Sequence, residues 1–283
     1  MFQKWMKLGA TEPVLQDVSR KAFGGPKMEK NGQRERIIVT DTGRERMDKE
    51  MMALGELMKE APVWWQLDGS LNVSLRKKAQ GGDYIGEHSD VDVSVMRSEL
   101  SELEPYLKER GYGLFLRSKD GNMRTFRRVG HEVFKGRKLE GTWEAPYIMA
   151  MDERGEILPG ADLARIQISI VDTDADGNPK ERDIVYPKEW LTGESVGVNG
   201  SSVMLSHPAR YLLFKVLQMR DYDDKDLEEL GKLRALTRED LTTVERLVFA
   251  AAKDDEWWAR NPKLTKDLDR LQKRFDLLKA SVL

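Results

Sequence analysis

Residues 91–95 read Val-Asp-Val-Ser-Val, and this alternation constrains the fold more than any other stretch of the chain. Side chains on a β-strand point to opposite faces in turn. The three valines therefore share one face and can pack on a core, and the other face carries Asp90, Asp92 and Ser94. Two like charges on one face repel each other unless a cation or protons lie between them. The stretch predicts either a cation-binding strand or a half-exposed strand with two solvated aspartates.

The composition limits the cation and the chemistry that such a strand can serve. The 283 residues include no cysteine and only three histidines. Disulfides, thiolate zinc sites and cysteine nucleophiles are therefore excluded, and a metal site would depend mainly on carboxylates. Oxygen ligands suit magnesium, manganese or calcium.

Charge and hydropathy narrow the class of partner and the location. Lys plus Arg number 47 and Asp plus Glu 49, so the formal net charge is −2, which argues against a broad basic surface for nucleic acid. No stretch approaches the roughly 20 apolar residues that cross a bilayer. Residues 1–10 also lack the continuous apolar run of a secretory signal. We expect no membrane partner and a cytoplasmic location.

Hydrophobic periodicity divides the chain into three parts. Residues 1–62 comprise a polar, weakly periodic arm and an amphipathic helix from Arg44 to Ala61. The pattern of strands and helices expected in residues 63–200 predicts a core of mixed α/β (α+β) class. Residues 201–283 predict a helical part. The expected strands are 63–67, 91–96, 112–117, 123–128, 147–151, 164–171 and 183–186. The expected helices of the core and the helical part are 69–79, 98–110, 208–221, 224–233, 238–253 and 262–282.

A glycine turn precedes the acidic strand. The expected strand 63–67 leads directly into Asp68-Gly69-Ser70 and a helix. Glycine at such a turn lets backbone N–H groups approach a phosphate, and the start of a helix favours an anion. A phosphate cradle and a carboxylate pair are thus predicted within one strand–turn–helix–loop–strand unit.

The run from Trp64 to Ser70, followed by the run from Glu87 to Val93, resembles the nucleotidyltransferase superfamily. It is most similar to the small antibiotic nucleotidyltransferases that act on lincosamides and aminoglycosides, and to related toxin nucleotidyltransferases. Their pattern is Gly-Gly or Gly-Ser, a helix, then Asp-x-Asp on the next strand. The resemblance implies a mixed β-sheet flanked by helices, and transfer of a nucleoside monophosphate from a nucleoside triphosphate to a hydroxyl.

The same resemblance assigns roles to residues of this chain. Gly69 and Ser70 would bind the triphosphate, and Asp90 and Asp92 would ligate Mg²⁺ or Mn²⁺ and serve in catalysis. Members of the family also carry a helix with a lysine, followed by a Lys-Asp-x-x-Asp-Leu-like run. Lys215 would then neutralise phosphate charge, or it lies along an apolar helix face with its ammonium in water. We expect Asp226 to cap or pair within the helices.

The family pattern includes a third carboxylate on a later strand. In the expected strand 164–171 the polar face carries Gln167 and Ser169, where an aspartate would stand. Asp172 is our candidate for the third catalytic acid, although it has the wrong parity unless a bulge intervenes. Asp152 is the alternative.

Two further segments have competing interpretations. Residues 172–183 resemble a calcium loop, but their strand-like flanks favour a β-hairpin. A basic run over residues 117–138 would attract a triphosphate or a tRNA-like acceptor, or it decorates a solvated hairpin edge, which we favour. The run comprises Arg117, Lys119, Arg124, Arg127, Arg128, Lys135, Arg137 and Lys138.

The first functional hypothesis is a metal-dependent nucleotidyltransferase whose acceptor is a small molecule, a protein or RNA, tRNA included. The alternative is a catalytically degenerate protein of the same fold that binds nucleotide or a partner protein. A third hypothesis is a helical interaction protein in which residues 201–283 bind a partner.

Overall fold

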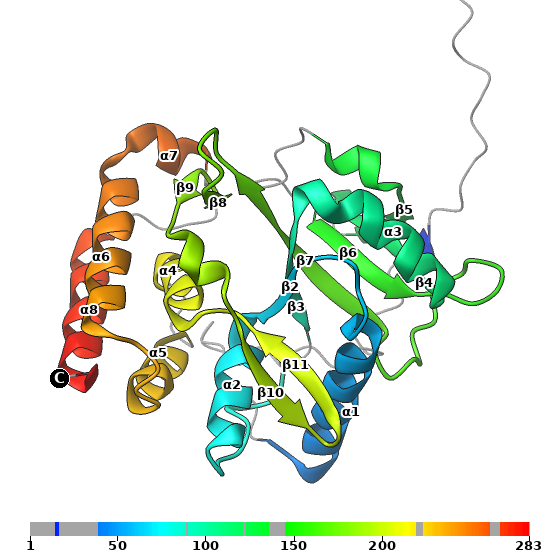
Figure 1. Cartoon of the computed structure of the whole chain (residues 1–283), viewed down its shortest axis with the longest axis horizontal. Coiled ribbons are helices and arrows are strands. Elements are labelled where there is room, and N and C mark those ends of the chain that lie inside the picture. The colour runs from blue at the N-terminus through cyan, green and yellow to red at the C-terminus, as the bar shows by residue number, and fades with distance from the viewer. Residues whose placement is uncertain are drawn as a thin grey trace, which may run out of the picture.

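The computed structural model describes residues 15–16, 39–88, 90–120, 123–135, 145–218, 223–260 and 267–282 (Figure 1). Most of the arm predicted for residues 1–43, and Ser89 within the acidic stretch, lie outside these residues. The chain has the mixed α/β architecture that the sequence predicts, with a central sheet and flanking helices.

The sheet has the order β1-β5-β4-β6-β7-β3-β2-β11-β10, and β8 and β9 extend it from the end of β7. It is mixed, because β3 runs parallel to β7 and β2 runs parallel to β11, whereas the other neighbours are antiparallel. The strands are β1 (Leu15–Gln16), β2 (Trp65–Asp68), β3 (Asp92–Met96), β4 (Tyr112–Asp120), β5 (Met123–Arg128), β6 (Ala145–Ala150), β7 (Arg165–Thr173), β8 (Pro179–Glu181), β9 (Ile184–Val185), β10 (Glu194–Val198) and β11 (Ser201–Leu205).

The predicted alternation along β3 is confirmed. Val91, Val93 and Val95 are buried in one core cluster, which also holds Ile166 and Ile168 of β7. Helix α1 (Asp41–Met58) contributes Met47 and Leu54 to the same cluster, so the amphipathic helix of the predicted N-terminal part packs into the core of the sheet. Burial on this face leaves the opposite face of β3 for its polar side chains.

Two more helices complete this half of the molecule. Helix α2 (Gly69–Ala79) follows β2 directly, and α3 (Leu100–Glu109) follows a short 3-10 turn after β3. In Figure 1, α3 lies over β4 and β6, while α2 stands between the sheet and the C-terminal helices. The start of α2 is therefore next to both the sheet and the helical part.

The C-terminal helices gather on one side of the sheet around a second core cluster (Figure 1). They are α4 (Pro208–Gln218), α5 (Asp223–Lys232), α6 (Arg238–Lys253), α7 (Asp255–Arg260) and α8 (Leu268–Val282). The four predicted helices are confirmed within the described residues, whereas the short α7 was not predicted. Among the helices described, none combines the length and apolar character that spanning a bilayer requires.

The hairpin of β10 and β11 was not predicted from the sequence. Its turn is Asn199-Gly200, and both residues have positive φ, +47° and +92°. Asn-Gly between two short strands is a strong hairpin signal, because both residues tolerate this conformation. The sheet consequently continues to Leu205, past residue 200, where we expected the helical part to begin.

Residues 172–183 form the predicted hairpin. Asp172 pairs with Lys180 and Thr173 with Pro179 in the antiparallel β7–β8 ladder. The Asp174 carboxylate accepts hydrogen bonds from the backbone N–H groups of Asp176 and Asn178, at 3.0 and 2.8 Å. An aspartate that closes its own turn in this way accounts for the acidic composition of the loop.

His207 lies just before α4 and has a local structural role. Its Nδ1 accepts a hydrogen bond from the Ala209 N–H at 3.2 Å, and its ring stacks on Trp190 with a centroid distance of 6.1 Å. Nδ1 is thus an acceptor, so the neutral ring carries its proton on Nε2.

Replacing His207 by asparagine should flatten the pH dependence of stability below about pH 6.5. Burial lowers the pKa of His207 below its ordinary value. The unfolded chain then binds more protons than the folded chain as the pH falls. The contribution of His207 to the free energy of unfolding is therefore fully present above about pH 6.5 and decreases below it. Asparagine keeps an acceptor for the Ala209 N–H. Urea unfolding of both proteins at pH 7.5 and pH 5.5 measures the effect, and an equal loss in both would contradict it.

Candidate functional site

The glycine turn and the acidic strand meet. Asp68, the last residue of β2, is the register partner of Asp92, the first residue of β3. Gly69 has φ +68°, and a Cβ added to it would lie less than 3.0 Å from Oδ2 of Asp92. The turn therefore requires glycine for its conformation and for the close approach of the Asp92 carboxylate.

Asp90 lies just ahead of β3 and is about half exposed. Arg165 of β7 donates from Nη2 to Asp90 Oδ1 over 2.6 Å. Both Asp90 and Asp92 contribute to the pKa of Tyr147, which burial raises to about 12. The two aspartates are thus brought to the same region of the sheet, and Asp90 already has a cationic neighbour.

Helix α1 adds a third acidic group near Asp90. Arg46 donates to the His88 carbonyl at 2.8 Å and to Glu50 at 2.9 Å, which fixes α1 against the loop before β3. Burial raises the pKa of Glu50, and the charges of Arg46, Arg165 and Asp90 also act on it. Glu50 could not be predicted as part of this region, because nothing in the sequence indicates that α1 reaches the loop before β3.

Gln167 occupies the position beside Asp92 on β7. The two are register partners in the parallel β3–β7 ladder, so their side chains share a face. The Tyr147 hydroxyl donates to Gln167 Oε1 at 2.8 Å and holds the amide in place. A neutral amide stands where the resemblance implies a third carboxylate, as the parity of the sequence indicated.

The structure does not bring Asp172 to this region. It lies five residues beyond Gln167, about 16 Å along the strand at about 3.3 Å per residue. The spacing from Gln167 to Asp172 is odd, and the β3–β7 ladder over residues 92–96 has no bulge. The side chain of Asp172 therefore lies on the opposite face of β7 from that of Gln167. Arg97 binds its carboxylate at 2.5 and 3.0 Å. Asp152, the alternative, accepts backbone N–H groups within its own turn.

Ser70 and Lys215 lie in contact. Lys215 Nζ donates to Ser70 Oγ at 2.9 Å and to Asp226 Oδ2 at 2.8 Å, and the Ser70 hydroxyl donates to Asp226 at 2.6 Å. Lys215 is 4% exposed and Asp226 is fully buried. Asp226 pairs across α4 and α5 as expected, and it also reaches the start of α2, which was not expected.

A second cation from α4 reaches the other side of Gly69. Arg210 is fully buried, and its Nη2 lies 3.2 Å from Asp68 Oδ2 and 2.5 Å from Ser94 Oγ. Its Nε donates to Glu181 Oε1 at 2.8 Å and to the Tyr186 hydroxyl at 3.0 Å. This network could not be predicted from the sequence, because its five members come from five separate segments of the chain. Helix α4 thus contacts both neighbours of Gly69.

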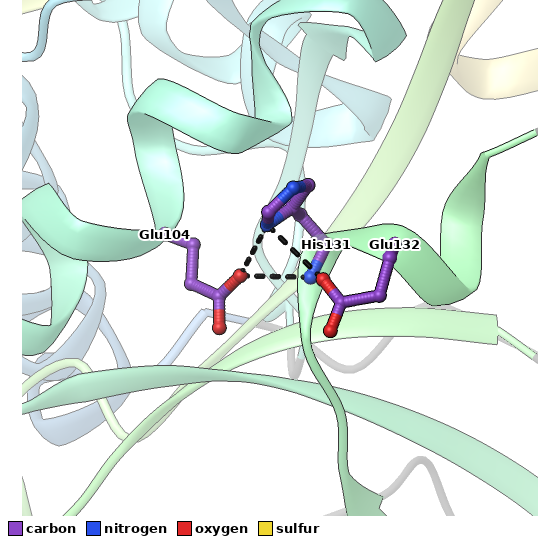
Figure 2. Close-up of side chains that lie close together, drawn as sticks. All are labelled: Glu104, His131 and Glu132. Atoms are coloured by element: carbon purple, nitrogen blue, oxygen red, sulfur yellow. Dashed lines mark hydrogen bonds and ion pairs between the residues drawn. The ribbon is translucent and has the colours of Figure 1, made fainter.

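A separate group of potential ligands lies on α3 and the turn that follows β5. Figure 2 shows Glu104, His131 and Glu132, whose ligand atoms lie within 4.8 Å of one another. Glu104 accepts from the His131 backbone N–H at 2.8 Å and contacts the ring Nδ1 at 2.7 Å. These bonds fix the turn to α3 and account for the grouping, so we assign no function to it.

Part of the basic run lies near the acidic strand. The Arg117 guanidinium is 5.1 Å from the centroid of the Tyr147 ring, and Arg117 is among the charges that act on Tyr147. Arg127 and Arg128 follow on β5. The side chains of Lys119 and Arg124, and residues 136–138, lie outside the described residues. Whether the run serves an acceptor stays a prediction.

No protein-family model matches this sequence, and no curated protein matches it. Solved structures that are similar in fold include an antigenic nucleotidyltransferase-like protein from Paracoccidioides brasiliensis, with a TM-score of 0.40 and 13% identity over 77% of this chain and 94% of that chain. The lincosamide antibiotic adenylyltransferase LnuA, lincomycin-bound, has a TM-score of 0.38 and 14% identity over 70% of this chain and 99% of its own.

Proposed function

We propose that this chain binds a nucleoside triphosphate with Mg²⁺ or Mn²⁺ and transfers its nucleoside monophosphate to a hydroxyl of an acceptor. The observation that carries this proposal is the contact of the Gly69 turn with Asp92. It brings a helix start suited to a phosphate next to a carboxylate suited to a cation. The acceptor is a small molecule, a protein or RNA such as tRNA.

The residues at the turn fit a triphosphate. Backbone N–H groups at the start of α2 favour an anion, and glycine at position 69 leaves no side chain in their way. The Lys215 ammonium, held at Ser70 and paired with Asp226, adds a cationic hydrogen-bond donor at the same point. We propose that Gly69, Ser70 and Lys215 bind the phosphates.

The carboxylates fit a hard divalent cation. Asp90 and Asp92 supply oxygen donors on one side of the sheet, and Gln167 beside them offers an amide oxygen that Tyr147 already engages. A cation held by Asp90 and Asp92 would withdraw charge from the transferred phosphate. Because position 167 is an amide, removal of the acceptor proton would fall to one of the two aspartates.

The neutral side chain of Gln167 favours a second candidate function. A protein that keeps the phosphate cradle and two aspartates, but lacks a third acid, can bind nucleotide without transferring it. The two candidates differ in turnover and agree in nucleotide binding. If the wild type is a transferase, Gln167→Asp should raise its rate of transfer. If the wild type only binds nucleotide, Gln167→Asp should create transfer only where the rest of the site is intact.

Asp92→Asn should abolish nucleotide binding that depends on the metal. Each labelled nucleoside triphosphate is incubated with Mg²⁺, and bound and transferred label are measured for the wild type and for Asp92→Asn. We expect affinity to fall by more than about 100-fold, because even outer partners of a metal site change affinity by about 10–100-fold. Asp172→Asn is the matched control, since Arg97 binds that carboxylate far along β7.

The outcomes separate the hypotheses. Binding and transfer by the wild type, both lost in Asp92→Asn and kept in Asp172→Asn, support the transferase. Binding without transfer supports the degenerate protein. A wild type that binds none of the nucleotides, or an Asp92→Asn variant that binds normally, would refute both.

A further inference from the structure

Asp68 places a third carboxylate beside the proposed site. Directly opposed residues of an antiparallel pair share a face, with Cβ atoms about 4.5–5.5 Å apart. Asp68 opposes Asp92 in the β2–β3 ladder. It also directly precedes Gly69, at the start of α2. An extra negative charge here would oppose a triphosphate, unless the protein directs it elsewhere.

The Asp68 carboxylate does not cap α2. An aspartate at the residue before a helix ordinarily accepts the N–H groups of the second or third helical residue, here Ser70 and Leu71. Asp68 and the first turn of α2 lie entirely within the described residues 39–88, and there the side chain makes no capping hydrogen bond. The preferred local interaction of this aspartate is therefore not made.

Three donors outside α2 explain the orientation of the carboxylate. Ser94 Oγ donates to Oδ2 at 2.8 Å, Ser206 Oγ donates to Oδ1 at 3.2 Å, and Arg210 Nη2 lies 3.2 Å from Oδ2. Arg210 supplies the only formal positive charge among these three donors. It is itself fixed by Glu181, so its guanidinium cannot follow Asp68 toward α2.

We infer that Arg210 is a positioning residue, which holds the Asp68 carboxylate away from the start of α2 and from Asp92 so that a triphosphate can bind there. This inference rests on the proposed function. Without the guanidinium, Asp68 turns toward the Ser70 and Leu71 amides and occupies the place of a phosphate oxygen. The same movement adds a carboxylate beside Asp92, which strengthens the attraction for a bare cation.

Arg210→Gln should therefore change two affinities in opposite directions. ATP and GTP affinity in saturating Mg²⁺ should fall about tenfold, the order expected for a unit charge several ångströms away in partly screened surroundings. Affinity for Mn²⁺ alone, measured by electron paramagnetic resonance without nucleotide, should rise several-fold. A loss of packing alone would weaken both.

Asp68→Asn supplies the control. In the Arg210→Gln/Asp68→Asn double variant the carboxylate is gone, so nucleotide affinity should return to within about threefold of the Asp68→Asn single variant, a difference of about 0.7 kcal/mol. Arg210→Gln with unchanged affinities, or a double variant as weak as Arg210→Gln, would overturn the inference. Ser206→Ala removes one donor to Asp68 without removing a buried charge. As in Arg210→Gln, nucleotide affinity should fall and Mn²⁺ affinity should rise, each by a smaller factor.

Hydrogen exchange separates this inference from the proposed function. If Asp68 turns to cap α2, exchange at the Ser70 and Leu71 amides slows in Arg210→Gln, or in Ser206→Ala if the arginine variant does not fold. A wild type that binds no nucleotide refutes the proposed function, and the exchange rates still report where Asp68 points. Unchanged rates in both variants refute the role of Arg210 even if the wild type binds nucleotide.

Discussion

Gly69→Ala should lose nucleotide binding and also destabilise the fold. At φ +68° an L-residue is strained by about 1–2 kcal/mol. The added Cβ would also overlap Oδ2 of Asp92, so the carboxylate must leave its position. We expect nucleotide affinity in Mg²⁺ to fall by at least about tenfold, or 1.4 kcal/mol. Isothermal titration and urea unfolding measure the two effects.

Gly81→Ala is the matched control. Gly81 also has positive φ, +85°, but a Cβ there meets no atom within 4 Å. It lies just past the other end of α2, where its N–H donates to the Lys78 carbonyl. Both alanine variants should lose stability through backbone strain, Gly69→Ala by more because of the overlap with Asp92, and only Gly69→Ala should lose binding. Equal binding by both variants would show that the approach of Gly69 to Asp92 has no part in nucleotide recognition.

Lys215→Met should have a large effect on stability and on binding, for separate reasons. The fully buried Asp226 carboxylate loses the ammonium at 2.8 Å, and breaking a buried pair by removing one partner costs about 3–5 kcal/mol. Nucleotide affinity falls because positive charge at Ser70 is gone. Thermal or urea unfolding and nucleotide titration measure the two losses.

A double variant separates these reasons. In Lys215→Met/Asp226→Asn neither charge remains, so most of the lost stability should return, whereas nucleotide affinity should stay low. Lys232→Met is the control, because its pair with Glu229 lies at the surface and contributes about 0–1 kcal/mol. If the double variant binds nucleotide as the wild type does, Lys215 has only a structural role.

The local parts of the site could be predicted from the sequence. The alternation in residues 91–95 fixes which side chains face the core, and the run Asp68-Gly69-Ser70 predicts a turn into a helix, because both depend only on neighbours in the chain. The amide at position 167 also followed from parity, since β7 has the expected strand pattern.

The contacts between distant segments could not be predicted. Asp68 beside Asp92 depends on the register of β2 against β3, which a 23-residue connection does not specify. Arg210 and Asp226 reach the glycine turn from positions 141 and 157 residues after Gly69, and nothing in the sequence of their helices indicates which charges they contact. The hairpin at Asn199-Gly200, in contrast, was detectable in the sequence and was missed.

Because β11 pairs with β2 in parallel, β2 lacks this partner strand until late in synthesis of the chain. Leu205 opposes Leu67, and the Ser206 N–H donates to the Leu67 carbonyl at 3.0 Å. Until residues 201–206 have left the ribosome, β2 presents a bare edge that another nascent chain can join. A fragment that stops at residue 200 would keep this edge permanently, so we expect it to aggregate even though it contains both aspartates and the glycine turn.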